Sequence, residues 1–189
     1  TPYRMVSTAD SLWAIDVDNN GYVYVSEAGG EEKPGRILVF KGINNEPAWA
    51  DLHDAQPIQT LTIPDNGSIR GLAVNGDGTV IYASNYTNNK IYCYIGSPTT
   101  GYSQYTSFNF NYTDTLFIYD ANQIPIDTLY PGPVGLGFMN DKNILFVACD
   151  VMFTTSAYSY GRIYALNPNT GEYLDTIDAA AWNYLYTGQ

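Results

Sequence analysis

Two short apolar runs separated by a polar turn recur three times along the chain. The clearest copy spans residues 69–85, with its turn at 75–78, Asn-Gly-Asp-Gly. The other two copies span 12–27, with a turn at 18–21, and 133–149, with a turn at 140–143. Apolar runs of this length on both sides of a turn rich in Asn, Asp and Gly predict β-hairpins.

Each predicted hairpin is followed by two more strand-like runs. The third run opens with a basic residue and Ile, at 36–40, 90–94 and 162–166, and the fourth lies at 57–63, 124–129 and 173–177. Pro125 inside the second of these outer runs is tolerated only at a sheet edge, which agrees with an outermost strand. A four-stranded unit that returns after about 60 residues is typical of a propeller blade.

The sequence therefore predicts an all-β chain of the β-propeller type, with about three four-stranded blades. We place the blades at about 8–63, 64–130 and 131–178, within one domain, and assign 1–7 to the outer strand of a preceding blade. Propellers have about four to eight blades, so three form a partial ring. The chain could be a fragment of a longer protein, two copies could complete a six-bladed ring, or open copies could assemble into a fibre.

The repeat resembles a known family at this level of detail. Residues 71–85 read Gly-Leu-Ala-Val-x-x-x-Gly-x-x-Ile-Tyr-Ala-Ser-Asn, 90–92 read Lys-Ile-Tyr, and 161–172 read Gly-Arg-Ile-Tyr-Ala-Leu-Asn-Pro-Asn-Thr-Gly-Glu. These stretches are similar to the blades of NHL and YVTN-type β-propellers. The resemblance implies the blade architecture and leaves the function open, because this architecture serves many tasks.

Composition narrows the function classes. Charged residues make up 14% of the chain, against about 25% in a typical soluble domain, which favours an extracellular or cell-surface β protein. The net charge of −11 disfavours nucleic acid, whose binding depends on Lys and Arg. We also expect no membrane insertion, because no apolar run reaches about 18 residues. Cys93 and Cys149 lie in apolar runs and are expected to be buried free thiols.

One motif has the spacing of a calcium loop. Asp16, Asp18, Asn20 and Glu27 fit the pattern of an EF-hand loop, with Gly21 at the turn. The flanking residues alternate as strands and are not helical, and the other two repeats lack the first Asp. The alternative is a hairpin turn whose Asp and Asn side chains cap backbone N–H groups. Ca²⁺ is the one cofactor that the sequence suggests.

The enzymes closest to this architecture are lactonases of the SMP-30 type, and the resemblance implies metal ligands just before the inner Gly-Leu of their blades. Trp13, Arg70 and Val134 stand there and are not ligands for a hard cation. His53 is the only histidine, and we expect it in a loop. No catalytic residue is predicted.

Arg70, at the start of an inner strand, could bind a carboxylate or form a structural salt bridge.

Two further groups are candidate surface features. Aromatic residues gather in the insertion after the second hairpin, and we predict a contact surface there formed by Tyr102, Tyr105, Phe108, Phe110 and Tyr112. Most aromatic residues elsewhere are expected in the core. Sequons at Asn66, Asn85 and Asn111 are glycosylation candidates if the protein is secreted.

These observations favour a non-enzymatic scaffold or binding module, extracellular or on the cell surface. Its expected partner is a protein, a glycan or further copies of itself, reached through loops and open blade edges. The alternatives are an NHL- or SMP-30-like hydrolase or lyase whose active site lies in blades not present here, and a subunit of an extracellular fibre.

Overall fold

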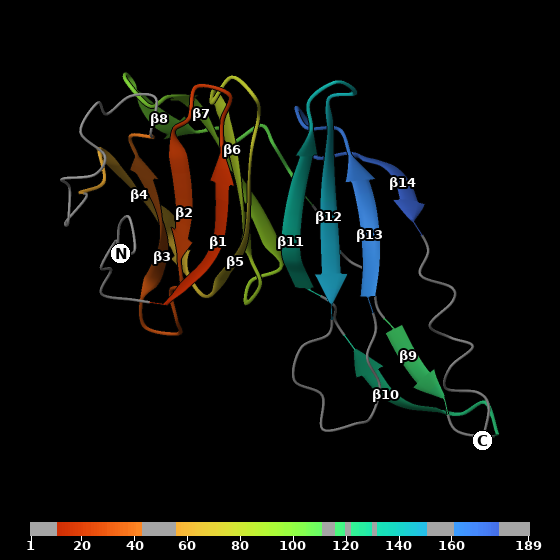
Figure 1. Cartoon of the computed structure of the whole chain (residues 1–189). Helices are drawn as coiled ribbons and strands as arrows, with labels where there is room; N and C mark the ends of the chain where they lie inside the picture. The colour runs from red at the N-terminus through yellow and green to blue at the C-terminus, as the bar shows by residue number, and fades with distance from the viewer. Residues whose placement is uncertain are drawn as a thin grey trace, which may run out of the picture.

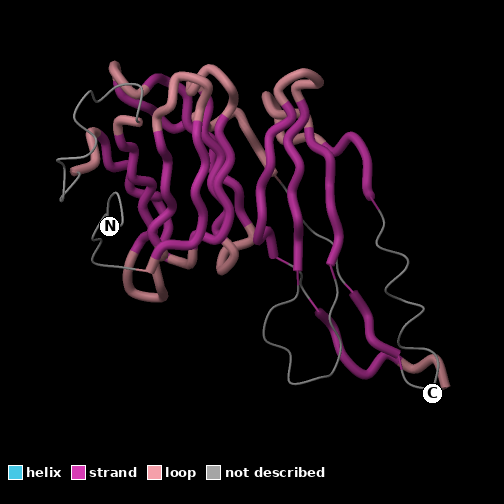
Figure 2. The backbone as a smooth tube through the Cα atoms, viewed as in Figure 1, coloured by secondary structure: helices cyan, strands magenta, loops and turns pink. Residues whose placement is uncertain are grey.

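The architecture is known from a computed structural model, which describes residues 11–42, 56–110, 116–119, 122–129, 132–150 and 161–177. Every regular element in these ranges is a β-strand (Figures 1 and 2). Among them there is consequently no helix long and apolar enough to cross a membrane. The predicted strand at 3–6, the loop with His53, and the short helix or turn expected at 179–182 lie outside the described residues.

Twelve strands form three open, four-stranded antiparallel sheets, each ordered as in the chain. Sheet 1 comprises β1 (Leu12–Val17), β2 (Val23–Glu27), β3 (Pro34–Phe40) and β4 (Gln59–Asn66). Sheet 2 comprises β5 (Ile69–Val74), β6 (Val80–Asn85), β7 (Lys90–Ser97) and β8 (Gly101–Gln104). Sheet 3 comprises β11 (Gly132–Met139), β12 (Ile144–Asp150), β13 (Gly161–Leu166) and β14 (Tyr173–Ile177). The prediction of an all-β, propeller-type chain with three such sheets is confirmed.

The outer strand of sheet 2 differs from the prediction. It is β8, whereas β10 (Pro125–Leu129) pairs with β9 (Leu116–Tyr119) in a separate hairpin that projects beyond sheet 3 (Figure 1). The reason is a tight turn directly after β7, where the Ser97 hydroxyl hydrogen-bonds the Thr100 hydroxyl and backbone N–H. Gly101 completes this turn with a positive φ of 95°. The insertion therefore follows a finished blade.

The three repeated hairpin turns share one backbone conformation. The fourth turn residue has a positive φ in each, 82° at Gly21, 67° at Gly78 and 52° at Asn143. Gly adopts this region without a steric penalty and Asn tolerates it better than most residues. The turns that the sequence predicted are thus confirmed, and they set the pairing register of each inner hairpin.

The core lies between the sheets. One cluster joins the facing sides of sheets 1 and 2, and it contains Tyr24, Ile37, Val39, Ile63, Ile69, Leu72, Val74, Ile81, Ala83, Tyr92 and Tyr94. A second cluster joins sheets 2 and 3, and it contains Ala73, Tyr82, Ile91, Cys93, Phe108, Phe110, Leu145, Val147, Cys149, Tyr164 and Leu166. Sheet 2 is therefore buried on both faces, as a middle blade should be. Both cysteines are buried thiols outside any disulfide, as predicted.

The inner strands β1, β5 and β11 lie side by side. The pairing of each with its neighbour slips by one residue at the same place in the repeat, at Trp13, Arg70 and Val134. A bulge of this kind leaves the extra residue unpaired and redirects its side chain. The Gly or Ala after the bulge then re-enters the ladder, and in sheets 1 and 2 its N–H donates to a hydroxyl, Ser26 Oγ or Ser84 Oγ.

Gly71 shows how closely the inner strands approach. A Cβ there would lie 2.7 Å from the Val134 carbonyl oxygen and 3.0 Å from the Leu136 nitrogen, both on β11. We predict that Gly71→Ala lowers the free energy of unfolding by about 1–3 kcal/mol, since it pushes sheets 2 and 3 apart. Chemical denaturation measures the change.

Gly30→Ala is the matched control, because a Cβ at Gly30 meets nothing within 4 Å. It should change stability by less than about 0.5 kcal/mol. Equal effects of the two substitutions would contradict the close approach of β5 and β11.

Candidate functional site

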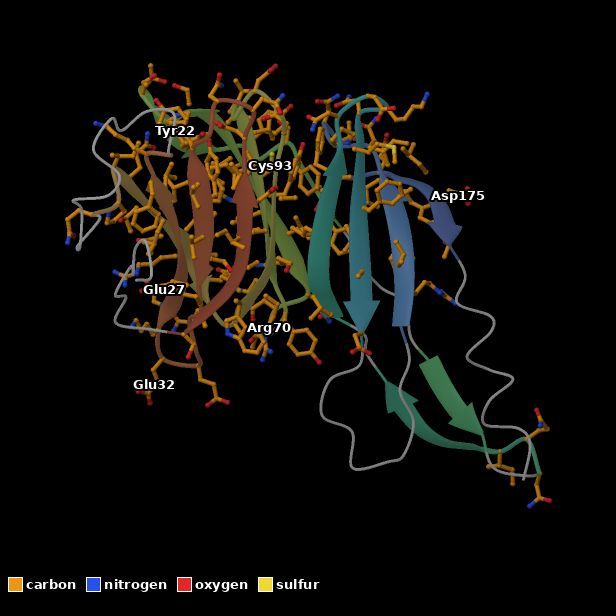
Figure 3. The ribbon with its side chains drawn as sticks, in the orientation of Figure 1. Tyr22, Glu27, Glu32, Arg70, Cys93 and Asp175 are labelled. Carbon is orange, nitrogen blue, oxygen red and sulfur yellow. The ribbon has the colours of Figure 1, made fainter. Side chains whose placement is uncertain are left out.

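One end of the sheets gathers the inner-strand bulges and the loops between strands. The β2–β3 loop, the β4–β5 connection and the β6–β7 turn meet there, at the lower end in Figure 3, where Glu27, Glu32 and Arg70 are labelled. Tyr22 marks the opposite end, which carries the hairpin turns. We call the lower end the loop face.

Arg70 is the central cation of the loop face. Its guanidinium carbon lies 3.7 Å from the centre of the Trp13 ring and 5.7 Å from that of Tyr86. Its Nε donates to Ser68 Oγ at 2.9 Å, while its Nη1 is buried and has no hydrogen-bond partner. Burial lowers the Arg70 pKa, and nearby Tyr86 acts in the opposite direction.

The predicted structural salt bridge at Arg70 is not formed with any residue that the structure describes. Ion pairs are seen instead at Arg36 with Glu27 and at Lys90 with Asp65. Arg70 instead stacks on an aromatic ring, an arrangement that suits the flat, weakly hydrated guanidinium. In the described part of this acidic chain, the Arg70 cation has no carboxylate partner.

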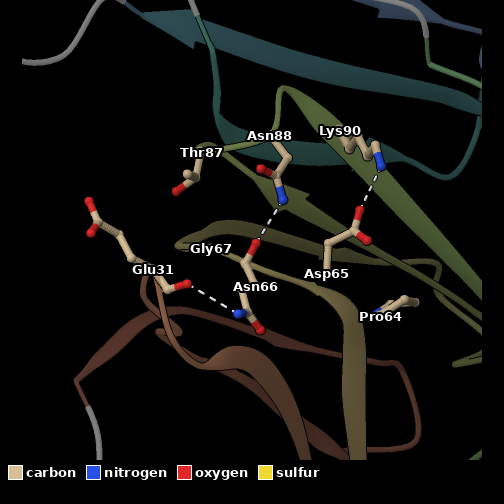
Figure 4. A pocket seen from close by; sticks show the side chains of 8 residues that line it. All are labelled: Glu31, Pro64, Asp65, Asn66, Gly67, Thr87, Asn88 and Lys90. Carbon is tan, nitrogen blue, oxygen red and sulfur yellow. Dashed lines mark hydrogen bonds and ion pairs between the residues drawn. The ribbon is translucent and has the colours of Figure 1, made fainter.

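A polar groove of about 820 Å³ lies between sheets 1 and 2 on the same face (Figure 4). Its lining is Glu31, Pro64, Asp65, Asn66, Gly67, Thr87, Asn88 and Lys90. Asn66 Nδ2 donates to the Glu31 carbonyl at 3.1 Å, and Asn88 Nδ2 donates to the Asn66 carbonyl at 2.7 Å. Amide and hydroxyl groups in such a groove offer hydrogen bonds to a polar ligand.

One ion pair closes the groove wall. Lys90 Nζ lies 2.6 Å from Asp65 Oδ2, and the Tyr92 hydroxyl donates to the same oxygen. These two hydrogen bonds, that of Lys90 first, lower the pKa of the Asp65 carboxyl. Burial and the Asp65 carboxylate together raise the pKa of Tyr92.

The four predicted calcium residues are not brought together. Asp18 lies in the hairpin turn, and its Oδ1 accepts from the N–H groups of Asn20 and Tyr22, each at 2.9 Å. Asp16 Oδ2 accepts from Val74 N at 2.7 Å, and so joins β1 to β5. Glu27 is buried at the other end of β2 and pairs with Arg36. In the described part of the chain no group of three acidic, His or Cys residues could hold a metal ion.

Asp18 takes the capping role that the sequence offered as the alternative. It is buried, and its second oxygen accepts from the Tyr24 hydroxyl, which in turn hydrogen-bonds Tyr102. Tyr102 also donates to the Gly78 carbonyl. Burial raises the pKa of Tyr102 to about 12. This network ties the first hairpin to sheet 2.

The predicted aromatic contact surface is wrong for Phe108 and Phe110, while Tyr102 and Tyr105 are half-buried. Phe108 and Phe110 are buried in the core between sheets 2 and 3, and Tyr105 packs against that core. The segment also bonds to sheet 3, through Asn109 N and the Thr170 carbonyl at 2.9 Å. The apolar rings fill the space between the two sheets and are thereby shielded from solvent. Tyr112 lies outside the described residues.

The sequons differ in accessibility. Asn66 is exposed at the groove, although its amide nitrogen is engaged with Glu31. Asn85 is fully buried, with its side chain bonded to Asn66 and Asn88, so the folded chain has no room for a glycan there. Asn111 lies outside the described residues.

Sequence reasoning missed two contributors to the loop face. Tyr86 was not selected, although it directly follows the inner hairpin whose first strand carries Arg70. Trp13 was considered only as a residue unfit to bind metal. The signal that could have found the pair is the repeat itself, because Trp13 and Arg70 occupy equivalent positions in neighbouring units.

Comparisons with known proteins give no family. No family model and no curated protein matches the sequence. Among solved structures, the chain is similar to one described as "Kuenenia stuttgartiensis Hydrazine Synthase", with a TM-score of 0.38 and 9% identity. The match covers 90% of this chain and 51% of that one, so the chain spans about half of its length.

The calcium hypothesis can be tested through Asp18. We predict that Asp18→Ala lowers the free energy of unfolding by about 1–3 kcal/mol, because three donors lose their acceptor. The loss should be the same with Ca²⁺ and with a chelator, as measured by denaturation in each. Asp77→Ala, at an exposed position of the second hairpin turn, is the control and should have little effect. Stabilisation by Ca²⁺ that disappears in Asp18→Ala would restore the calcium site.

A pH experiment tests the ion pair in the groove. Because the folded pKa of Asp65 is lowered, its contribution to stability is complete above the ordinary value of about 4 and is lost as the pH falls through the folded pKa. Lys90→Met should raise the Asp65 pKa toward that ordinary value, as followed by the NMR shift of the carboxyl carbon. Lys142→Met, in the third hairpin turn, should leave it unchanged.

Proposed function

We propose that this chain is a non-enzymatic, extracellular or cell-surface binding module of the propeller type. Its ligand is a partner, protein or glycan, that presents a carboxylate to the loop face. The single observation that carries the proposal is the state of Arg70, a stacked cation that has no carboxylate partner among the residues that the structure describes. The polar groove on the same face supports it with further hydrogen-bonding groups.

The chemistry of Arg70 suits this role. The stack on Trp13 fixes the plane of the guanidinium in advance. The Arg70 side chain therefore loses little conformational entropy when a ligand carboxylate binds. The fork of N–H groups matches the two oxygens of a carboxylate, and such charge-assisted hydrogen bonds are among the stronger ones in proteins. Trp13, which is about half exposed, offers an aromatic surface beside the cation for an apolar or sugar face.

The setting favours binding over catalysis. The three bulge positions, where a propeller enzyme would place converging ligands, carry Trp13, Arg70 and Val134. The buried thiol of Cys93 has its pKa raised to about 12 by burial, which keeps it protonated and unreactive. Neither these three bulge residues nor Cys93 supplies a nucleophile or a general base near neutral pH.

Calorimetric titration tests the proposal with two probes, a glutamate-rich peptide and an oligogalacturonate, each beside its neutral counterpart. We expect the acidic probe of at least one pair to bind, and Arg70→Gln to weaken that binding by about 10- to 100-fold, the equivalent of losing a hydrogen bond to a charged group. The two arms distinguish a protein partner from a glycan.

Lys142→Gln removes the same charge from the hairpin-turn end and should leave binding unchanged. Thermal unfolding of both variants verifies that they are folded. Equal weakening by the two substitutions would assign binding to overall charge, and failure of both acidic probes to bind would refute the proposed function.

A further inference from the structure

We propose that the ligand of the loop face is a glycan with a single carboxylate, which binds Arg70 through that carboxylate and the polar groove through neutral hydroxyl groups. The inference rests on the proposed function and narrows it, because it selects a sugar over an acidic peptide and limits the number of charges on that sugar. It follows from the connection between Arg70 and the groove and from the polar atoms that the groove presents.

Arg70 borders the groove through one residue. Its Nε donates to Ser68 Oγ at 2.9 Å, and Ser68 N donates to Thr87 Oγ1 at 3.0 Å. Thr87 lines the groove, and it directly follows Tyr86, whose ring lies beside the guanidinium. The groove volume of about 820 Å³ falls within the range of about 300–1,000 Å³ that is usual for small-molecule sites. A short oligosaccharide can therefore meet the cation and the groove together.

One nitrogen of the guanidinium is accessible to such a ligand. Nε is used by Ser68, and Nη1 is buried. Nη2 bonds to no residue that the structure describes and, unlike Nη1, is not buried. Trp13, on whose ring the guanidinium stacks, is about half exposed. The site thus presents a charged donor beside an aromatic ring, and a carboxylated sugar ring uses both.

Three acceptor oxygens of the groove bond to no described residue. Asp65 uses only Oδ2 in its hydrogen bonds with Lys90 and Tyr92, which leaves its Oδ1 (Figure 4). Asn66 and Asn88 each donate through Nδ2 to a backbone carbonyl, which leaves the Oδ1 of both side chains. A ligand with several donors satisfies these acceptors, and the hydroxyl groups of a sugar are such donors.

The charge of the groove disfavours a peptide with several acidic residues. Of the described residues that line it, Glu31 and Asp65 are acidic, and Lys90 is already paired with Asp65. The whole chain carries a net charge of −11. Further carboxylates of a ligand would meet like charge there, whereas sugar hydroxyls carry none. The one carboxylate therefore belongs at Arg70 and the neutral part of the ligand in the groove.

Uronic acids and sialic acids share this chemistry, because each places one carboxylate among hydroxyl groups. Calorimetric titration with two pairs of sugars separates them. The first pair is xylotriose with and without a 4-O-methylglucuronic acid substituent, and the second is lactose with and without a sialic acid. We expect at least one acidic sugar to bind about 10- to 100-fold more tightly than its neutral counterpart, the equivalent of a hydrogen bond to a charged group.

The outcome also separates this inference from the proposed function. Binding of the glutamate-rich peptide alone, or of the oligogalacturonate alone, would overturn the singly charged glycan and leave a carboxylate-binding module. Failure of every acidic probe, peptide and sugars included, would refute both.

Two variants test the division of the ligand between cation and groove. Arg70→Gln should remove the preference for the acidic sugar over the neutral one. Asn88→Ala should weaken binding of the acidic sugar by about 3- to 10-fold, since one hydrogen bond is lost. Asn169→Ala, at an exposed position of the β13–β14 turn at the opposite end of the sheets, is the matched control and should not weaken it. Equal affinities of the Asn88→Ala and Asn169→Ala variants would exclude the groove from the site.

An NMR titration of the native protein needs no variant and distinguishes contact from a structural role of Asn88. The acidic sugar should shift the side-chain amide signals of Asn66 and Asn88 together with the indole N–H signal of Trp13. The side-chain amide signal of Asn169 should stay unchanged. A shift at Trp13 without shifts at Asn66 and Asn88 would confine the ligand to Arg70 and overturn the inference.

Discussion

The packing of one sheet face on the next is the interaction on which the structure depends. Each sheet alone would expose two apolar faces, and sheet 2 has both of them covered by neighbouring sheets. Successive buried residues along the strands of sheet 2 belong alternately to the two clusters, so this sheet serves two interfaces. Burial of apolar surface, which contributes about 25 cal/mol per Å², is the principal stabilising term. Hydrogen bonds within each sheet fix the register of its strands.

The inner strands impose the second constraint. They approach so closely that Gly71 leaves no space for a methyl group against β11. The bulges lie at the same end of these strands, where an extra residue at Trp13, Arg70 or Val134 is left unpaired while the rest of the strand keeps its pairing. The positions available for binding are thereby set by the packing of the scaffold.

Polar side chains that the sequence offers for chemistry are mostly used for structure. Asp16 and Asp18 hold backbone N–H groups of sheet 2 and of their own turn, and Glu27 neutralises Arg36. Arg70 is the exception, since its cation faces aromatic rings in place of a carboxylate. A charged group that the described residues leave without an opposite charge is the more informative candidate for function, and this contrast is the reason that Arg70 carries the proposal.

The sequence by itself determined the local architecture. The turn residues at Gly21, Gly78 and Asn143 require a positive φ, and the apolar runs beside them fix strands and register over a few residues. It did not determine which polar and aromatic residues remain accessible. Phe108 and Phe110 became core, Asn85 was buried, and the four residues of the calcium pattern were separated by the length of β2. Those outcomes depend on contacts between sheets that are distant in the chain, and local spacing carries no information on how such sheets meet.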